Sequence, residues 1–278
     1  MYSSFQMAGK YIRYYFSSLN GKGHGMHSPF IFHFITKVLN DKQSYPEYEK
    51  VETLRKQLLK DEMVLTIDDF GAGSSLDKSN IRTVAAIARN AAKSKKTGQL
   101  IFRIIREYQP KTILELGTSL GITTSYLSLA KPGSDLVTME GAKEVASIAR
   151  KNFESLGLQN ISIIEGNFDN TLSSVIKVLG TNEKSAAEGH EGSSVDFAFI
   201  DGNHRREPTE RYFHQLQSKT NNDSILVFDD IHWSREMEQA WETIKKHPSV
   251  RCTIDLFFTG IVFFREEFRE KQHFVIRF

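Results

Sequence analysis

The stretch TILELGTSLGITTSY, residues 112–126, decides how this chain folds. Its first part is an apolar, β-branched run that ends at Glu115, and such a run is typical of a buried parallel strand. Gly117 and Gly121 follow, and an amphipathic helical pattern begins after them. A strand, a glycine-rich turn and a helix N-terminus in this order form the cradle of nucleotide-type cofactors. We expect Gly117 to adopt positive φ, so that a ligand can lie against the backbone.

The spacing of the turn, E-x-G-x-x-x-G, differs from the G-x-G-x-x-G of dinucleotide-binding folds. A carboxylate at the strand end repels a pyrophosphate but suits a cationic ligand, and S-adenosylmethionine carries an amino group and a sulfonium. The stretch resembles motif I of class I S-adenosylmethionine-dependent methyltransferases. The resemblance implies a cofactor site, to which we assign Glu115, Gly117, Thr118, Ser119, Gly121 and Thr123.

Composition restricts the other classes of protein. The 278 residues are 40% hydrophobic, enough for one enlarged α/β domain or for a domain with an extension. The formal net charge of +2 gives no bulk attraction to nucleic acid, so a nucleic-acid partner is not expected. A single cysteine, Cys252, excludes an internal disulfide and suggests a reducing compartment. With no signal-peptide core and no apolar run long enough to span a bilayer, we expect a cytoplasmic protein.

Two regions of the chain differ in composition and in predicted secondary structure. Residues 1–105 are aromatic, basic and mostly helical in pattern, whereas strand-like and helix-like segments alternate in residues 106–278. This alternation predicts a parallel sheet with right-handed crossovers. Because only residues 258–260 or so join the last two predicted strands, these two must pair antiparallel. The predicted strands are residues 112–116, 136–140, 161–165, 195–200, 224–228, 251–257 and 261–264.

The methyltransferase resemblance implies the same α/β architecture. It is a Rossmann-like, seven-stranded methyltransferase sheet, with five parallel strands followed by a reversed C-terminal hairpin. We therefore expect a methyltransferase domain over residues 106–278 and a helical N-terminal extension over residues 1–105. The extension could cap the substrate, form the surface of a homodimer or simply pack on the sheet.

Two further strand ends are expected to hold the cofactor. The second strand ends at Glu140, roughly 20 residues after the glycine turn, where a carboxylate can accept both ribose hydroxyls. Gly141 follows it and is assigned to the same site. The third strand leads into Asn167, Phe168 and Asp169, and the resemblance implies that this loop holds the adenine by pairing and stacking. The alternative is an ordinary turn in which Asp169 caps the next helix.

Carboxylates follow the fourth and fifth strands. Asp201 ends VDFAFID, and Asp229 and Asp230 end SILVFDD. Adjacent parallel strands should bring the three to one edge of the sheet, where they either take up protons or bind a hard cation. Mg²⁺ prefers oxygen ligands, so it is the expected ion. Alternatively, these aspartates only cap helices or bind the cofactor, a role to which Asp201 is also assigned.

The stretches TGQLIFRIIREYQPKTILELGTSLGITTSYL, LVTMEGAKE, IDGNH and VFDD resemble the catechol and caffeoyl-CoA O-methyltransferases over roughly residues 97–264. In that family an acid after strand four and an acid–amide pair after strand five bind the metal. The 28-residue separation of Asp201 and Asp229 agrees with this pattern. Two residues depart from it: Asp230 stands where the family often has asparagine, and His204 where the animal catechol enzymes place a catalytic lysine.

His204 and Asp201 are the candidate catalytic residues. A histidine at this position can act as a general base near neutral pH. Equally, His204 can be a solvated histidine at the start of a helix that contains Arg205 and Arg206. His232 also lies near the proposed centre, and we expect it to be structural.

The predicted activity is transfer of the methyl group of S-adenosylmethionine to an oxygen of a small-molecule acceptor, with Mg²⁺ or a similar divalent cation. The alternatives are a metal-independent methyltransferase of the same fold and a non-catalytic cofactor-binding or assembly module. The loop IDGNH replaces the N/D-P-P-Y/F motif that nucleic-acid methyltransferases acting on exocyclic amines often carry, which argues against that class.

Three other segments attract weaker interpretations. The aromatic, basic residues 11–34 could contact RNA or a membrane surface, although mixed charges nearby make this the lesser reading. Residues 68–73, DDFGAG, are expected to form a turn, because no other kinase motif accompanies the DFG tripeptide. Residues 181–194 are polar and small, which predicts a surface loop.

Overall fold

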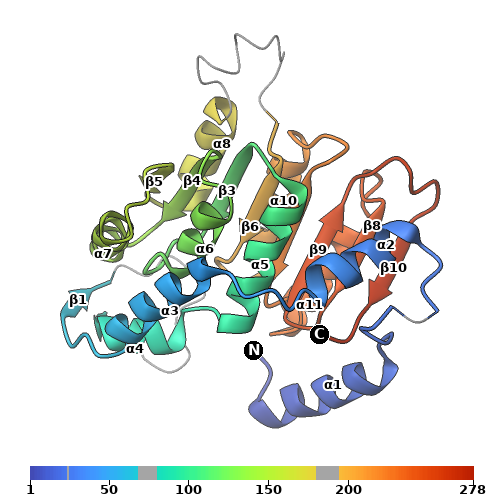
Figure 1. The fold of residues 1–278 in the computed structure, drawn as a ribbon, viewed down its shortest axis with the longest axis horizontal. Coiled ribbons are helices and arrows are strands. Elements are labelled where there is room, and N and C mark those ends of the chain that lie inside the picture. The colour runs from blue at the N-terminus through green and yellow to red at the C-terminus, as the bar shows by residue number, and fades with distance from the viewer. Residues whose placement is uncertain (24, 68–79, 180–193) are drawn as a thin grey trace. The chain divides into compact units, whose positions relative to one another are not determined.

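A computed structural model describes residues 1–23, 25–67, 80–179 and 194–278 (Figure 1). The turn expected at residues 68–73 lies outside the described residues, as does the loop expected at 181–194 apart from Ser194. The chain divides into two compact units. We call residues 42–182 the central unit, and residues 1–41 together with 183–278 the discontinuous unit.

Three parallel strands form the sheet of the central unit. They are β3 (Thr112–Leu116), β4 (Asp135–Glu140) and β5 (Ile161–Glu165), and β4 pairs with both of the others. All five residues of β3 are buried, which explains why its sequence is a nearly continuous apolar run. The register places Glu140 opposite Glu165, so the two strands end at the same level.

Helices and a short hairpin complete the central unit. Both α5 and α3 pack against α6, and the Tyr126 hydroxyl of α6 donates a 2.8 Å hydrogen bond to Glu52 of α3. A Cβ at Gly98 of α5 would lie 2.5 Å from the ring of Tyr126, so the two helices approach closely only because this residue is glycine. The elements are α3 (Pro46–Leu58), β1 (Val64–Thr66), β2 (Ile81–Thr83), α4 (Val84–Asn90), α5 (Lys95–Tyr108), α6 (Ile122–Ala130), α7 (Lys143–Ser155) and α8 (Phe168–Val178).

The discontinuous unit has a mixed sheet in the order β10-β8-β9-β7-β6. Strands β6 (Phe197–Ile200) and β7 (Ile225–Asp229) are parallel, and β9 (Thr259–Phe263) is antiparallel to both β7 and β8 (Cys252–Asp255). The reversed C-terminal hairpin predicted from the short connection is therefore confirmed. Strand β10 (Gln272–Val275), which pairs parallel with β8, was not predicted.

In the described residues, helical segments accompany this sheet. They are α1 (Ser4–Ser17), α2 (Pro29–Phe34), the π-helical η1 (Ile35–Leu39), α10 (Arg206–Gln217) and α11 (Arg235–Lys246). Within the described residues, no helix is both long enough and apolar enough to cross a membrane. The units place residues 1–41 and 42–105 in different bodies. The division at residue 105 that the sequence suggested stays a prediction.

The N-terminal segment is attached to the end of the described chain. The buried hydroxyl of Tyr14 donates to the carbonyl of Ile276 and accepts a 3.2 Å hydrogen bond from the amide of Phe278. Leu19 forms a parallel bridge with Ile276, and the ring of Tyr11 packs edge-on against that of Phe257. Residues far apart in sequence thus fix α1 against the C-terminal strands.

Candidate functional site

The loop after β3 has the left-handed backbone that its sequence predicts. Gly117 has φ 107°, Ser119 φ 48° and Gly121 φ 81°. The positive φ expected at Gly117 is confirmed. A Cβ at Gly121 would lie 2.4 Å from the ring of Phe153, so glycine is required there on steric grounds as well. The loop ends at Gly121, the N-cap of α6, which as glycine offers no side-chain cap to the first amides of that helix.

Glu140 ties the loops of the central unit together. Its Oε2 accepts a 2.8 Å hydrogen bond from the amide of Ser119, and its Oε1 a 2.9 Å bond from the amide of Ala142. Its backbone carbonyl accepts from the amide of Gly166, in the loop after β5. Through its two amide bonds the Glu140 carboxylate fixes the loops after β3 and β4. The cofactor role assigned to Glu140 and Gly141 stays a prediction.

Glu115 faces inward rather than into the loop. Its side chain is fully buried, and Oε2 accepts hydrogen bonds from Thr124 at 2.5 Å and Thr138 at 2.6 Å. The Thr138 hydroxyl also lies 2.6 Å from that of Thr118. The carboxylate therefore braces β3, β4 and α6 around the loop. The sequence predicts that Glu115, Thr118 and the buried Thr123 contact the cofactor. This arrangement does not test those contacts, so they stay predictions.

The loop after β5 combines two predicted roles. Asn167 is the N-cap of α8, and its Oδ1 accepts a 2.9 Å hydrogen bond from the amide of Asp169. The alternative interpretation named Asp169 as the cap of this helix, but the cap is Asn167. Phe168 is the first residue of the helix. Binding of adenine by these residues stays a prediction.

The candidate catalytic residues lie in the discontinuous unit, at the ends of β6 and β7. The register pairs Ile200 with Phe228, so Asp201 and Asp229 follow at neighbouring strand ends. His204 Nε2 lies 3.4 Å from Oδ1 of Asp201, which brings together the two predicted catalytic side chains. Asp229 is buried, with 3% of its surface exposed.

The backbone of these two loops is strained. Asn203, His204 and Asp230 have φ values of 66°, 31° and 55°, a region that non-glycine residues rarely adopt. Such conformations persist only where the surrounding structure enforces them, and they are concentrated at functional sites. The strain therefore singles out the same loops as the sequence motifs do.

A preformed metal centre is not present in the described part of the chain. No three histidine, cysteine, aspartate or glutamate side chains there form a group that could hold a metal ion. The strand ends that carry Asp201, Asp229 and Asp230 meet as predicted, but these side chains do not form such a group. Binding of a divalent cation at these strand ends stays a prediction.

Sequence reasoning missed several neighbours of His204. The ring of Trp233 lies 5.6 Å from the ring of His204, and Asn203 donates a 3.2 Å hydrogen bond to the hydroxyl of Tyr212. The motif VFDDIHW contains Trp233, so an aromatic residue just after two strand-end acids was the available signal.

His232 belongs to a partly buried charge network. Its Nδ1 lies 3.0 Å from Glu238 and its Nε2 2.8 Å from Asp255. Burial disfavours the charged imidazole, but the hydrogen bonds to the two carboxylates outweigh burial and raise the pKa of His232. Lys10 and Tyr2 also bond to Glu238, at 2.8 Å and 2.7 Å. These contacts agree with the structural role expected for His232.

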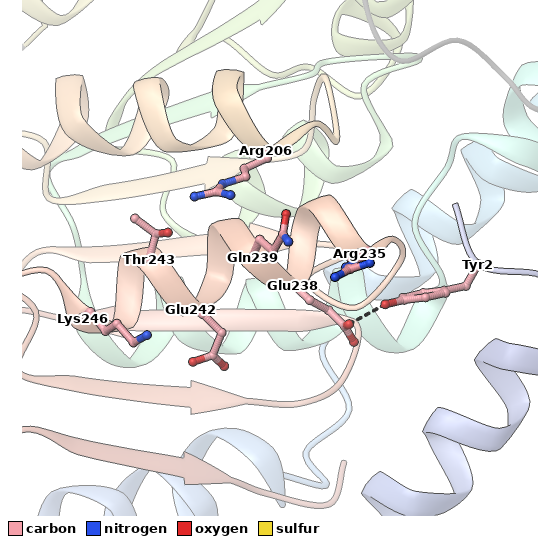
Figure 2. A pocket seen from close by; sticks show the side chains of 8 residues that line it. All are labelled: Tyr2, Arg206, Arg235, Glu238, Gln239, Glu242, Thr243 and Lys246. Atoms are coloured by element: carbon pink, nitrogen blue, oxygen red, sulfur yellow. Dashed lines mark hydrogen bonds between the residues drawn. The ribbon is translucent and has the colours of Figure 1, made fainter.

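Figure 2 shows a shallow pocket on α11, beside the bond from Tyr2 to Glu238. It contains none of the residues predicted to bind cofactor or to act in catalysis. The residues lining it are Tyr2, Arg206, Arg235, Glu238, Gln239, Glu242, Thr243 and Lys246.

Comparisons with known proteins agree with the sequence motifs. The family described as "Methyltransferase domain" matches residues 114–231. Catechol O-methyltransferase of Bos taurus is 36% identical over 73 residues, which are 26% of this chain and 27% of that protein. The Mus musculus enzyme is 38% identical over 71 residues, or 25% and 27%. The chain thus spans about a quarter of the length of the curated relatives it matches.

Solved structures extend the likeness to the fold. The O-methyltransferase TomG from Streptomyces achromogenes, solved with S-adenosylmethionine, has a TM-score of 0.51 at 18% identity, over 63% of this chain and 82% of that one. A Podospora anserina methyltransferase bound to S-adenosylhomocysteine has a TM-score of 0.56 at 14% identity, over 86% and 97%. The Rossmann-like methyltransferase fold predicted from the sequence is confirmed. The predicted resemblance to S-adenosylmethionine-dependent methyltransferases is confirmed as well, because residues 114–231 match the methyltransferase domain family.

Proposed function

We propose that this chain transfers the methyl group of S-adenosylmethionine to an oxygen of a small-molecule acceptor. The observation that carries the proposal is the carboxylate of Glu140, which joins the loops after β3 and β4 through the amides of Ser119 and Ala142. The names of the matched relatives support O-methylation in particular.

In this proposal the loops after β3, β4 and β5 bind the cofactor. Glu140 accepts the ribose hydroxyls, and Gly117 lets the ligand lie against the backbone. The loop after β5, beginning at Asn167, holds the adenine. The remaining contacts come from Glu115, Thr118, Ser119, Gly121, Thr123, Gly141, Phe168, Asp169 and Asp201.

His204 is the proposed proton acceptor. His204 takes the proton of the acceptor hydroxyl while that oxygen bonds to the methyl carbon and the carbon–sulfur bond of the sulfonium breaks. The products are the methyl ether and S-adenosylhomocysteine. Asp201, 3.4 Å from the imidazole, stabilises the imidazolium that forms. Proton transfer of this kind contributes roughly 10²–10⁴-fold to the rate.

A divalent cation, with Mg²⁺ as the expected ion, is proposed to bind at Asp201, Asp229 and Asp230 when the acceptor is present. Neighbouring strand ends and the likeness to catechol O-methyltransferases support this. Such an ion would polarise the acceptor hydroxyl. The metal-independent alternative is supported by the contact between His204 and Asp201, which provides a base without any ion.

We further propose that residues 1–105 form an extension beside a domain of residues 106–278, that the chain works in the cytoplasm, and that it forms a homodimer. The single, buried cysteine supports a reducing compartment.

Calorimetric titration of the purified chain with S-adenosylmethionine and S-adenosylhomocysteine tests the proposal. The substitution Glu140→Ala should weaken binding by about 1.5–3 kcal/mol, the range for hydrogen bonds to charged groups. Glu165→Ala is the matched control: Glu165 ends the neighbouring strand, and it forms an ion pair with Arg150 on the surface. Melting temperatures of both variants separate lost contacts from lost folding.

The outcomes distinguish the alternatives. No cofactor binding by the intact chain would refute the proposal. Binding without release of S-adenosylhomocysteine across a panel of catechols and other hydroxylated aromatics would favour the non-catalytic module. Equal affinity in Glu140→Ala would remove only the ribose assignment.

A further inference from the structure

Helix α1 carries an apolar stripe on its outer face. Phe5, Ile12 and Phe16 are 93%, 57% and 80% exposed. Together with Gly9 they are spaced four, three and four positions apart, which places them on one side of a helix. A Cβ at Gly9 would meet no atom within 4 Å, so the middle of the stripe is also open. Exposed apolar patches of this kind mark interaction sites.

The opposite face of α1 is anchored, so the stripe has a fixed orientation. Tyr14 is buried and bonds to the carbonyl of Ile276. Lys10 forms a 2.8 Å ion pair with Glu238. A capping box at Ser3 also secures the first turn of the helix. The discontinuous unit therefore presents Phe5, Ile12 and Phe16 as a preformed surface.

Cations flank the stripe. At 100° per residue, Arg13 lies beside the line of Phe5, Ile12 and Phe16. On the other side, the guanidinium of Arg277 sits 4.1 Å above the ring of Tyr15. Residues 1–40 contain no aspartate or glutamate at all, although they carry lysine and arginine residues. The surroundings of the stripe thus complement a negatively charged surface.

We propose that α1 docks this protein onto a membrane surface that contains anionic phospholipids. The helix lies in the plane of the interface, with its apolar stripe among the acyl chains and with Arg13 and Arg277 against the headgroups. With 14 residues it is too short to span a bilayer. A second copy of the chain is the less suitable occupant. Two α1 helices packed against each other would bring their arginines close together, and residues 1–40 contain no acidic side chain that could offset this repulsion.

Co-sedimentation with lipid vesicles tests this inference. The intact chain should bind phosphatidylcholine vesicles that contain about 30% phosphatidylserine, and added salt should weaken the binding, because the surface potential decays within a Debye length. The double variant Phe5→Ser/Phe16→Ser should lose at least about tenfold in vesicle affinity. Its melting temperature should not change, because both rings are already exposed. Arg13→Gln should lower the affinity for the anionic vesicles alone.

Val178→Ser is the matched control, since Val178 is an apolar residue of α8 that is 65% exposed. It should bind vesicles as the parent does. Equal binding to vesicles with and without phosphatidylserine would overturn the inference, as would unchanged binding by the double variant. Sedimentation that shows a dimer, lost in the double variant, without any vesicle binding would assign the stripe to a second copy. None of these measurements uses the cofactor, so their outcome does not depend on whether the chain transfers methyl groups.

Discussion

Replacing Thr138 with valine should destabilise the protein more than the same change at Thr124. The Thr138 hydroxyl donates to Glu115 Oε2 at 2.6 Å and lies 2.6 Å from the Thr118 hydroxyl, from which it accepts. Within the described residues, the Thr124 hydroxyl bonds to Glu115 alone. Valine has nearly the same shape as threonine, so the change removes hydrogen bonds with little change in packing.

The magnitudes follow from the charge of the partner. A hydrogen bond to a charged group contributes about 1.5–3 kcal/mol and a neutral one about 0.5–1.5 kcal/mol. Thr124→Val should therefore cost about 1.5–3 kcal/mol and Thr138→Val about 2–4.5 kcal/mol. The buried position of Glu115 favours the upper part of each range, because water cannot replace the lost donor.

Urea denaturation measures both changes as free energies of unfolding. Thr209→Val is the matched control, because this buried hydroxyl donates to the sulfur of Met237 at 3.5 Å, a weak acceptor. It should cost less than about 1 kcal/mol. The reasoning is refuted if Thr124→Val costs as much as Thr138→Val, or if neither exceeds the control.

Four further predictions concern the site and the pH dependence. His204→Gln should lower kcat by roughly 10²–10⁴-fold with unchanged cofactor affinity; an unaltered pH–rate profile would remove His204 from the mechanism. Chelator should abolish activity and Mg²⁺ restore it, whereas Asp229→Asn should not respond to Mg²⁺; full activity in chelator would leave the metal-independent alternative. Gly121→Ala should cost at least about 2 kcal/mol, because its Cβ would meet the ring of Phe153; a normal melting temperature would contradict this. Burial and then nearby cations lower the pKa of His247, so the unfolded chain binds more protons and stability should fall as pH drops below about 6.5. His247→Gln should flatten that fall in melting temperature, and an identical fall would exclude the histidine as its source.

Local pattern was sufficient for much of the fold. The bounds of β3 and β5 agree with the predicted strands, because each is an apolar run between clear breaks. The antiparallel C-terminal hairpin followed from the length of the connection alone, since three residues cannot form the crossover that parallel strands need. The strands that were missed, β1, β2 and β10, have only three or four residues each, too few for a periodic signal.

The sequence predicted the positions of the candidate site residues but not their hydrogen-bond partners. Strand ends identified Glu140 and Asp201, but nothing local showed that Glu140 holds the amide of Ser119, 21 residues earlier. The bond from Tyr2 to Glu238 joins residues 236 positions apart. Such pairs depend on tertiary folding, which a single sequence read by local pattern does not contain.

The attachment of α1 has a consequence for the order in which the protein is made. Tyr14 and its partner Ile276 are 262 positions apart. At about 5–20 residues per second, roughly ten to fifty seconds separate their appearance on the ribosome. The central unit, by contrast, is one continuous segment, so all its residues emerge before the strands that anchor α1. A nascent chain therefore carries α1 with both faces uncovered for most of its synthesis, and any chain stopped before Ile276 keeps that aromatic helix exposed to chaperones and proteases.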